Sequence, residues 1–319
     1  MNLWLRRAAG ALKDGNSLIV ADDCLKIAVV KAMSHDELSM DSGKAEFIYR
    51  CVRTSPWSLR PLTCAISSRV DGTHSWAVAL KGLMLVHGFF LDKVPAANSI
   101  GRLPFDLSGF GETRSLLTRS SGFNHFVRSY FEFLDQRAIL FHDSNLLHRQ
   151  VEESSVMIQL AIIRNMQDLV DSLMRIKPIA ENMRTPLIID AMDNVITEIV
   201  EVYGRICIGM AEALPKVHSK TGKPEAEMAL RIVAKSISQA EDLTKYFEFC
   251  QEFNVPKAGE IPDFVRIPEA DVTVLAKLVA ARVEKEEQLE GRSRENLVGD
   301  AEHGNVSSGR ERIPDLISL

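Results

Sequence analysis

The chain has 319 residues, of which 46% are hydrophobic and 25% are charged, and its formal net charge is −5 at pH 7. This composition is typical of a globular protein with enough apolar side chains for one long domain or two, and it excludes a chain that is disordered throughout. The negative charge provides no general attraction to nucleic acid or to anionic lipid, so we expect no nucleic-acid partner. Binding to a membrane surface would require a local basic patch.

The five cysteines lie far apart, and no pair has Cys-x-x-Cys spacing. They are Cys24, Cys51, Cys64, Cys207 and Cys250. This spacing argues against a zinc site and against a disulfide framework, and it favours buried free thiols in a reducing compartment. No apolar run of signal-peptide length follows the first arginines. We therefore expect a cytoplasmic protein with no metal and no other cofactor.

The first segment, residues 3–14, has the pattern of a basic amphipathic helix. Leu5 and Leu12 fall on one face, and two arginines and Lys13 are available to the other. Two interpretations fit this pattern: a helix that lies in a lipid interface, and a first helix that caps the core.

Shorter helices and polar turns are expected next. Periodicity predicts helices over residues 22–33, from Lys44 to the Ser55-Pro56 pair and over residues 62–68, with a polar loop over residues 34–43.

The segment from Arg69 to Phe90 organises the rest of the chain. From Trp76 onward it is apolar on nearly every side, and only Lys81, His87 and two glycines interrupt it. It is shorter than the roughly 20 residues that a bilayer span requires. We therefore predict a core helix surrounded by other helices, in which His87 is a hydrogen-bonded core histidine rather than a ligand or a base.

Longer amphipathic segments follow a connection rich in Gly and Ser over residues 95–122, in which one short helix is expected near 114–117. Periodicity predicts four further helices. The first covers residues 123–141, the second ends before Pro178, and the fourth runs from Pro224 to Pro256. The third has Thr185 as N-cap and Pro186 at the first helical position, and it ends at Pro215. A polar interruption over residues 143–150 is expected to separate the first two, and an extended strap is expected over residues 256–268.

No segment alternates with period 2 between turn signals, so we predict no β-sheet. Long helices joined by short polar turns indicate an all-α fold, a helical solenoid or extended bundle over residues 1–270. We expect at most a short helix over residues 271–290. Residues 291–319 are rich in Glu, Arg, Gly, Ser and Asn, which leaves little to bury, and we predict a disordered tail.

The sequence contains no recognisable active-site motif. It lacks a dinucleotide-binding glycine pattern, a phosphate-binding loop, a His-Glu-x-x-His pair and a Gly-x-Ser-x-Gly elbow. His142, Asp143 and Ser144 are adjacent, but adjacent residues do not converge as the members of a catalytic triad do. We therefore expect no enzymatic activity.

Several segments match a known family in order and in spacing. They are residues 10–14 (Gly-Ala-Leu-Lys-Asp), 28–35 (Ala-Val-Val-Lys-Ala-Met-Ser-His), 69–87, 126–130 with 134–135, 198–203 with Gly209, and 239–243 with 247–250. Together they resemble the ANTH domain of plant clathrin-assembly proteins, a family related to the clathrin assembly lymphoid myeloid leukaemia protein of animals. This resemblance implies the all-helical solenoid that periodicity also predicts.

The resemblance implies a role as well. Family members bind phosphatidylinositol 4,5-bisphosphate on the cytosolic leaflet, recruit clathrin through an unstructured tail and collect vesicle SNAREs as cargo. The resemblance thus implies that this chain is an adaptor at clathrin-coated pits of the plasma membrane, on coated vesicles and at the Golgi. The alternative is a scaffold that holds a SNARE or another partner helix on residues 186–250 and has weak or no direct contact with phosphoinositide.

The implied lipid site is a cluster of surface lysines with a histidine, and this chain keeps only part of it. Lys31, His35 and Lys44 are the implied phosphoinositide-binding residues, with Lys44 at the position of a second histidine, whereas Asp41 and Gly43 occupy the positions of two further lysines. Two missing lysines correspond to about 2 kcal/mol, or some thirtyfold in affinity. We therefore expect weak, salt-sensitive binding; the alternative is that these residues are merely solvated charges.

The last residues, Leu316-Ile317-Ser318-Leu319, resemble a clathrin box without its final acidic residue. The resemblance implies clathrin binding through Leu316, Ile317 and Leu319, and the alternative is a chance hydrophobic end.

Overall fold

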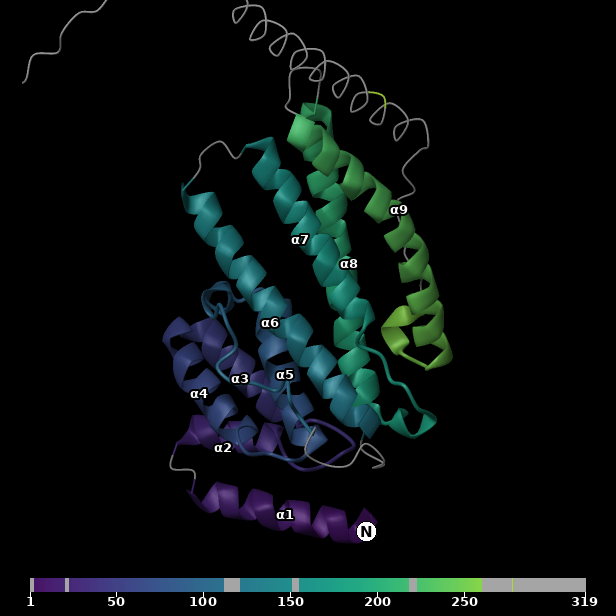
Figure 1. The fold of residues 1–319 in the computed structure, drawn as a ribbon. Coiled ribbons are helices and arrows are strands. Elements are labelled where there is room, and N and C mark those ends of the chain that lie inside the picture. The colour runs from purple at the N-terminus through teal and green to yellow at the C-terminus, as the bar shows by residue number, and fades with distance from the viewer. Residues whose placement is uncertain are drawn as a thin grey trace, which may run out of the picture.

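The computed structural model describes residues 3–20, 23–111, 121–150, 155–217 and 223–259, together with Lys277. Within these ranges the regular structure is entirely helical and contains no strand, so the all-α prediction is confirmed. Figure 1 shows helices α3 to α9 stacked side by side, with α1 lying across one end next to α2.

Five α-helices make up the N-terminal part of the fold, and a short 3₁₀ helix, η1 (Pro56–Ser58), joins the third to the fourth. They are α1 (Leu3–Val20), α2 (Cys24–Ala32), α3 (Ser42–Thr54), α4 (Leu59–Val70) and α5 (Trp76–Leu91).

The predicted starts of α3 and α4 were two and three residues too late, for local reasons, and α4 also ends two residues later than predicted. The side chain of Asp41 accepts a hydrogen bond from the backbone N–H of Lys44, so α3 begins at Ser42. Helix α4 begins at Leu59 and includes Pro61, which the first turn of a helix tolerates because its N–H would be unpaired there anyway.

Four longer helices make up the C-terminal part. They are α6 (Ser121–Gln150), α7 (Val156–Met174), α8 (Pro186–Ala213) and α9 (Lys223–Glu252), with the 3₁₀ helices η2 (Pro95–Ser99), η3 (Glu181–Met183), η4 (Leu214–Lys216) and η5 (Pro256–Ala258) at their ends. The predicted start of α8 is confirmed, because Thr185 Oγ1 accepts a hydrogen bond from the N–H of Ile188 and Pro186 is the first helical residue.

The predicted interruption over residues 143–150 is wrong. Helix α6 continues without a break to Gln150. This stretch contains polar residues but no proline and no glycine. Asp, Ser, Asn and His are only mildly unfavourable in a helix interior, and a helix that is already formed gains a backbone hydrogen bond for each residue added.

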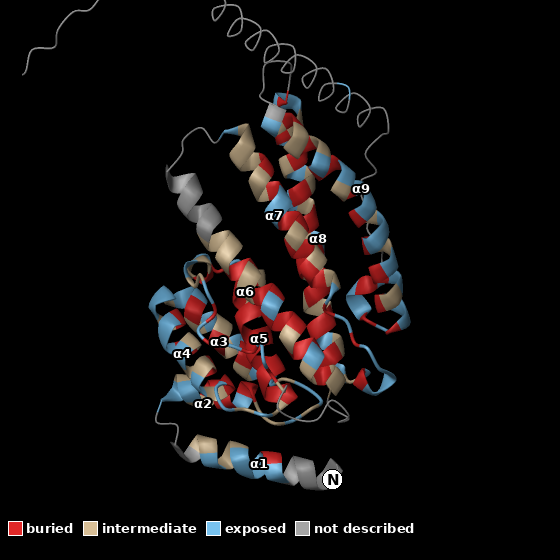
Figure 2. Cartoon of the chain, viewed as in Figure 1, coloured by how far each residue is buried: buried red, intermediate tan, exposed pale blue. Residues whose placement is uncertain are grey.

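Helix α5 is the centre of the fold, as its sequence predicts. Of its 16 residues, 14 are buried, Lys81 and His87 among them. It packs against α3, α4, α6 and α8, and Figure 2 shows buried residues along it and along the faces that surround it. Burial on all sides explains why no amphipathic period is visible in this segment.

Helix α7 links the second half of the fold. It packs against α6, α8 and α9, and η5 contacts both α8 and α9. Successive helices therefore bury one another's apolar stripes as in a solenoid. Among the described residues, no helix combines the length and the apolarity needed to cross a bilayer.

All five cysteines are free thiols, but the expectation that they are buried is only partly correct. Cys250 is buried, whereas Cys24 and Cys64 are exposed. The strap predicted to be extended over residues 256–268 begins instead with the 3₁₀ helix η5. Its residues 260–268, the expected short helix near 114–117, the region 271–290 apart from Lys277, and the tail 291–319 lie outside the described residues.

Candidate functional site

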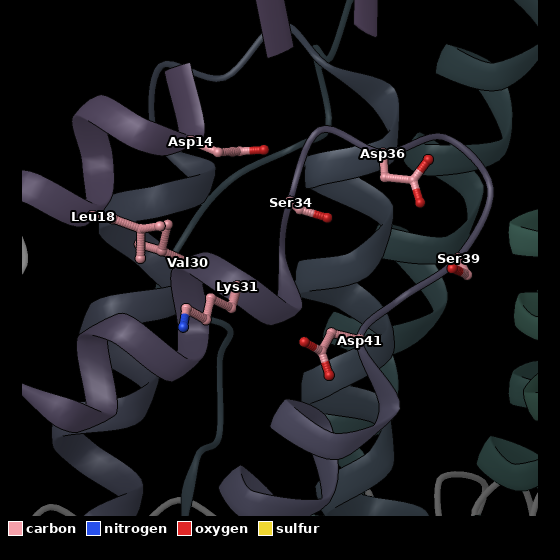
Figure 3. A pocket seen from close by; sticks show the side chains of 8 residues that line it. All are labelled: Asp14, Leu18, Val30, Lys31, Ser34, Asp36, Ser39 and Asp41. Carbon is pink, nitrogen blue, oxygen red and sulfur yellow. The ribbon is translucent and has the colours of Figure 1, made fainter. Parts of the chain in front are cut away.

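A pocket of about 340 Å³ opens at the end of the fold where α1, α2 and the α2–α3 loop (residues 33–41) meet. Figure 3 shows that its lining side chains come from these three segments and from the residue that caps α3. They are Asp14, Leu18, Val30, Lys31, Ser34, Asp36, Ser39 and Asp41.

The lining of this pocket carries three carboxylates and one ammonium group. Two of the carboxylates also support the local backbone: Asp36 Oδ1 accepts from the N–H of Leu38 at 3.2 Å, and Asp41 Oδ1 accepts from the N–H of Lys44 at 3.0 Å. In the part of the chain that the structure describes, no group of three or more His, Cys, Asp or Glu side chains is arranged to hold a metal ion. Asp36 and Asp41 therefore shape the loop, and carboxylates outnumber ammonium groups in the pocket lining.

Lys31 is the exposed cation of this pocket. It lies in the last turn of α2, where a positive charge also interacts favourably with the helix dipole. None of the ion pairs between described residues involves its ammonium group. In Figure 3 the ammonium nitrogen lies on the side of the pocket away from Asp41. Lys44, in the first turn of α3, is half-buried and does not line the pocket.

His35 points toward α1 instead of into the pocket. Its Nδ1 lies 2.6 Å from Asp14 Oδ1, and its backbone N–H donates to Asp14 Oδ2 at 2.8 Å. Its side chain is only 16% exposed. The same carboxylate pairs with the guanidinium group of Arg69 on α4, which also donates to Ser17 Oγ at 2.7 Å. His35 therefore helps to fasten α1 to the rest of the fold.

A glycine makes this approach of α1 possible. A Cβ atom added at Gly10 would lie 2.7 Å from Cβ of His35, a distance that real contacts do not reach. The sequence alone predicted no role for Gly10, Asp14 or Arg69. All three nevertheless lie in the segments that carry the family resemblance, and this position was the feature of the sequence that could have indicated a role for them.

Lys81 on α5 holds the other side of the loop. It is fully buried, and its Nζ donates to Ser34 O and Ser34 Oγ, each at 3.1 Å, and to Asp36 O at 2.7 Å. Burial lowers the pKa of Lys81 to about 8, against the opposing effect of the nearby Asp36 carboxylate. The sequence showed this lysine only as an interruption in an apolar helix.

A second group of charged residues lies in the core between α5, α6 and α8. His87 Nδ1 lies 2.7 Å from Tyr130 Oη, its Nε2 lies 3.4 Å from Glu198 Oε2, and the guanidinium group of Arg137 pairs with Glu198 Oε1. His87 and Glu198 are fully buried and Arg137 is 3% exposed. His87 is thus a hydrogen-bonded core histidine, as predicted.

Two pKa shifts describe the charge state of this core group. Burial alone would raise the pKa of Glu198, but its hydrogen bond with His87 and the positive charge of Arg137 outweigh burial and lower it to about 2. Burial lowers the pKa of His87. At neutral pH the group therefore consists of a carboxylate, a guanidinium ion and a neutral imidazole.

Comparison with known proteins extends the resemblance to most of the chain. A family model described as the ANTH domain matches residues 24–281. Three Arabidopsis thaliana proteins, provisionally named clathrin assembly proteins, are similar to this chain. One is 63% identical over 289 residues, covering 90% of this chain and 85% of the relative. A second is 50% identical and a third 46% identical, each covering 88% of this chain, with 86% and 77% of the respective relative covered. The chain belongs to the ANTH domain family.

Proposed function

We propose that this chain is a clathrin-associated trafficking adaptor that attaches to phosphoinositide membranes and brings clathrin together with SNARE cargo. Membership of the ANTH family and the names of the similar Arabidopsis proteins support this role. The observation that carries it is the position of Lys31, the first lysine of the family's lipid motif, exposed at the end of the fold formed by α1, α2 and the loop. The chain acts as a binding module at coated pits, coated vesicles and the Golgi.

The membrane contact is electrostatic and weak. Lys31 and Lys44 flank the loop, and Lys13 is exposed on α1 nearby. Each surface cation near anionic lipid contributes about 1 kcal/mol. The pocket's carboxylates oppose this attraction, and His35, which the family motif also implies as a ligand, is engaged with Asp14. Binding through so few charges decreases as salt screens them.

Replacing Lys31 with glutamate should weaken binding to vesicles that contain phosphatidylinositol 4,5-bisphosphate. The change removes one attraction and adds one repulsion, together about 2 kcal/mol or some thirtyfold in affinity. Cosedimentation with phosphatidylcholine vesicles, with and without the phosphoinositide and at two salt concentrations, measures this effect.

Lys245→Glu is the matched control, because Lys245 is 72% exposed on α9, outside the proposed membrane-contact site, and the change in net charge is the same. We expect this variant to bind as the wild type does. Equal binding of Lys31→Glu and wild type would contradict the membrane site, as would wild-type binding that survives high salt unchanged.

A second candidate function is a scaffold for a SNARE or another partner helix without direct lipid contact. Two observations favour it: carboxylates outnumber ammonium groups in the lining of the pocket around Lys31, and apolar side chains are exposed on the C-terminal helices. Ile208 on α8 is 62% exposed, Val200 on α8 is 45% exposed and Ile237 on α9 is 39% exposed. Absence of vesicle binding by the wild type, with retained SNARE binding, would favour this scaffold over the adaptor.

Clathrin binding is proposed to reside in Leu316, Ile317 and Leu319, which lie outside the described residues. Deleting residues 316–319 should abolish capture of the full chain by the immobilised clathrin terminal domain, because the three apolar side chains are the proposed contact. Ser318→Ala serves as the control and should bind normally. Undiminished capture of the deletion variant would mean that the apolar end is a chance feature.

A further inference from the structure

Three consecutive residues near the start of the α2–α3 loop, residues 34–36, form hydrogen bonds with side chains from two different helices. Lys81 on α5 binds Ser34 and Asp36, while Asp14 on α1 binds the intervening His35 through both backbone and side chain. The loop connects α2, which carries Lys31, to α3, which carries Lys44. The two attachments come from different helices, α5 and α1.

Lys81 is an unusual core residue. It is fully buried, yet no ion pair between described residues involves its ammonium group, and its hydrogen-bond acceptors are two backbone carbonyls and one hydroxyl of the loop. A buried ammonium group is unfavourable unless hydrogen bonds compensate, and an apolar side chain of similar volume is often equally stable or more stable. The lowered pKa of Lys81 is consistent with a charge that is kept in the core at a cost to the fold.

A stabilising role in the core therefore does not explain a lysine at this position, whereas fixing the loop does. The ammonium group has three N–H donors, and the loop supplies three acceptors at 2.7–3.1 Å. If the ammonium group were removed, the carbonyls of Ser34 and Asp36 would lose the hydrogen bonds from Lys81, and the loop would move to expose these carbonyls to water.

We propose that Lys81 is a positioning residue for the membrane-contact site, fixing the α2–α3 loop so that Lys31 and Lys44 face the membrane together. This inference rests on the proposed function, because it assumes that Lys31 and Lys44 contact the membrane. Lys81 itself never touches lipid, since it is fully buried beneath the loop.

Lys81→Met in the full chain tests the proposal. Methionine is unbranched and apolar, so it retains most of the packing volume and removes only the ammonium group. We expect amide hydrogen exchange at His35 and Leu38 to accelerate at least about tenfold through local opening. Affinity for phosphoinositide vesicles should fall about fivefold, the effect of losing one surface cation. The midpoint of thermal unfolding should not fall.

Two further variants separate positioning from a general loss of structure. Val195→Ala in α8 lowers stability far from the loop, because Val195 is fully buried there, and it should leave the loop's exchange and the vesicle affinity unchanged. Combining Lys81→Met with Lys31→Glu should reduce affinity by less than the product of the two single effects, since Lys81 acts through Lys31.

The outcomes distinguish this inference from the proposed function. Unchanged exchange at His35 and Leu38 in Lys81→Met would overturn the positioning role, as would faster exchange throughout the protein with an equal loss of thermal stability. If the wild type binds no vesicles, the proposed membrane function fails, and the positioning of the loop is then judged from the exchange data alone.

Discussion

Replacing Arg137 with methionine is expected to lower the free energy of unfolding by about 3–5 kcal/mol, because it leaves a buried carboxylate without its countercharge. Arg137 pairs with Glu198, and its guanidinium carbon lies 4.3 Å from the ring centroid of Phe90 and 4.6 Å from that of Phe141. The variant therefore loses an ion pair and two cation–π contacts in the core. Urea denaturation followed by circular dichroism measures the change.

Arg205→Met is the matched control for this prediction. Arg205 lies 4.9 Å from the same Phe141 ring, but it is 43% exposed and its ion pair with Glu201 is at the surface. Exposed ion pairs and exposed cation–π contacts each contribute at most about 1 kcal/mol, so this variant should lose much less stability than Arg137→Met. The double variant Arg137→Met/Glu198→Gln should be more stable than Arg137→Met alone, since it removes the unpaired charge. An Arg137→Met effect as small as that of Arg205→Met would contradict the stabilising role of the buried Arg137–Glu198 pair.

Acidification should destabilise the fold through the same core group. Glu198 has an ordinary pKa of 4.5 and a folded-state pKa of about 2, so the unfolded chain takes up its proton first as the pH falls. The pKa of His87 is lowered from 6.5 in the folded state, so the unfolded chain also protonates this residue first. Both residues contribute stability that is present at neutral pH. The contribution of His87 is lost as the pH falls below 6.5, and that of Glu198 as it falls from about 5 toward 2.

The free energy of unfolding, measured by urea denaturation at a series of pH values, checks this result. Glu198→Gln cannot ionise, so its stability should depend less on pH in the acidic range than that of the wild type. A wild-type profile that is flat between neutral pH and about pH 4 would contradict the assignment of His87 as a neutral core residue. Parallel profiles of Glu198→Gln and wild type in the acidic range would contradict the assignment for Glu198.

The lipid-binding motif implied by the family resemblance predicts where the residues of the candidate site lie in the chain, but not which contacts they make. The family motif placed Lys31, His35 and Lys44 within 14 residues of sequence, and in the structure they lie in the α2–α3 loop or within three residues of its ends. It could not show that His35 is engaged with Asp14, since that contact joins residues 21 apart. Nor could it separate Lys31, which lines the pocket, from Lys44, which does not.

Local sequence alone determined the helical class, the burial of α5 and the start of α8 at Thr185 and Pro186, because periodicity and capping depend on residues within one or two turns. Tertiary structure decided what the charged residues do. Lys81 meets Ser34 across 47 residues, and Arg137 meets Glu198 across 61. Such pairs form only when separate helices come together, and the low dielectric of the core strengthens their interaction only there. A lysine in an apolar helix therefore has no visible partner in the sequence, and in the fold it is the anchor of a loop.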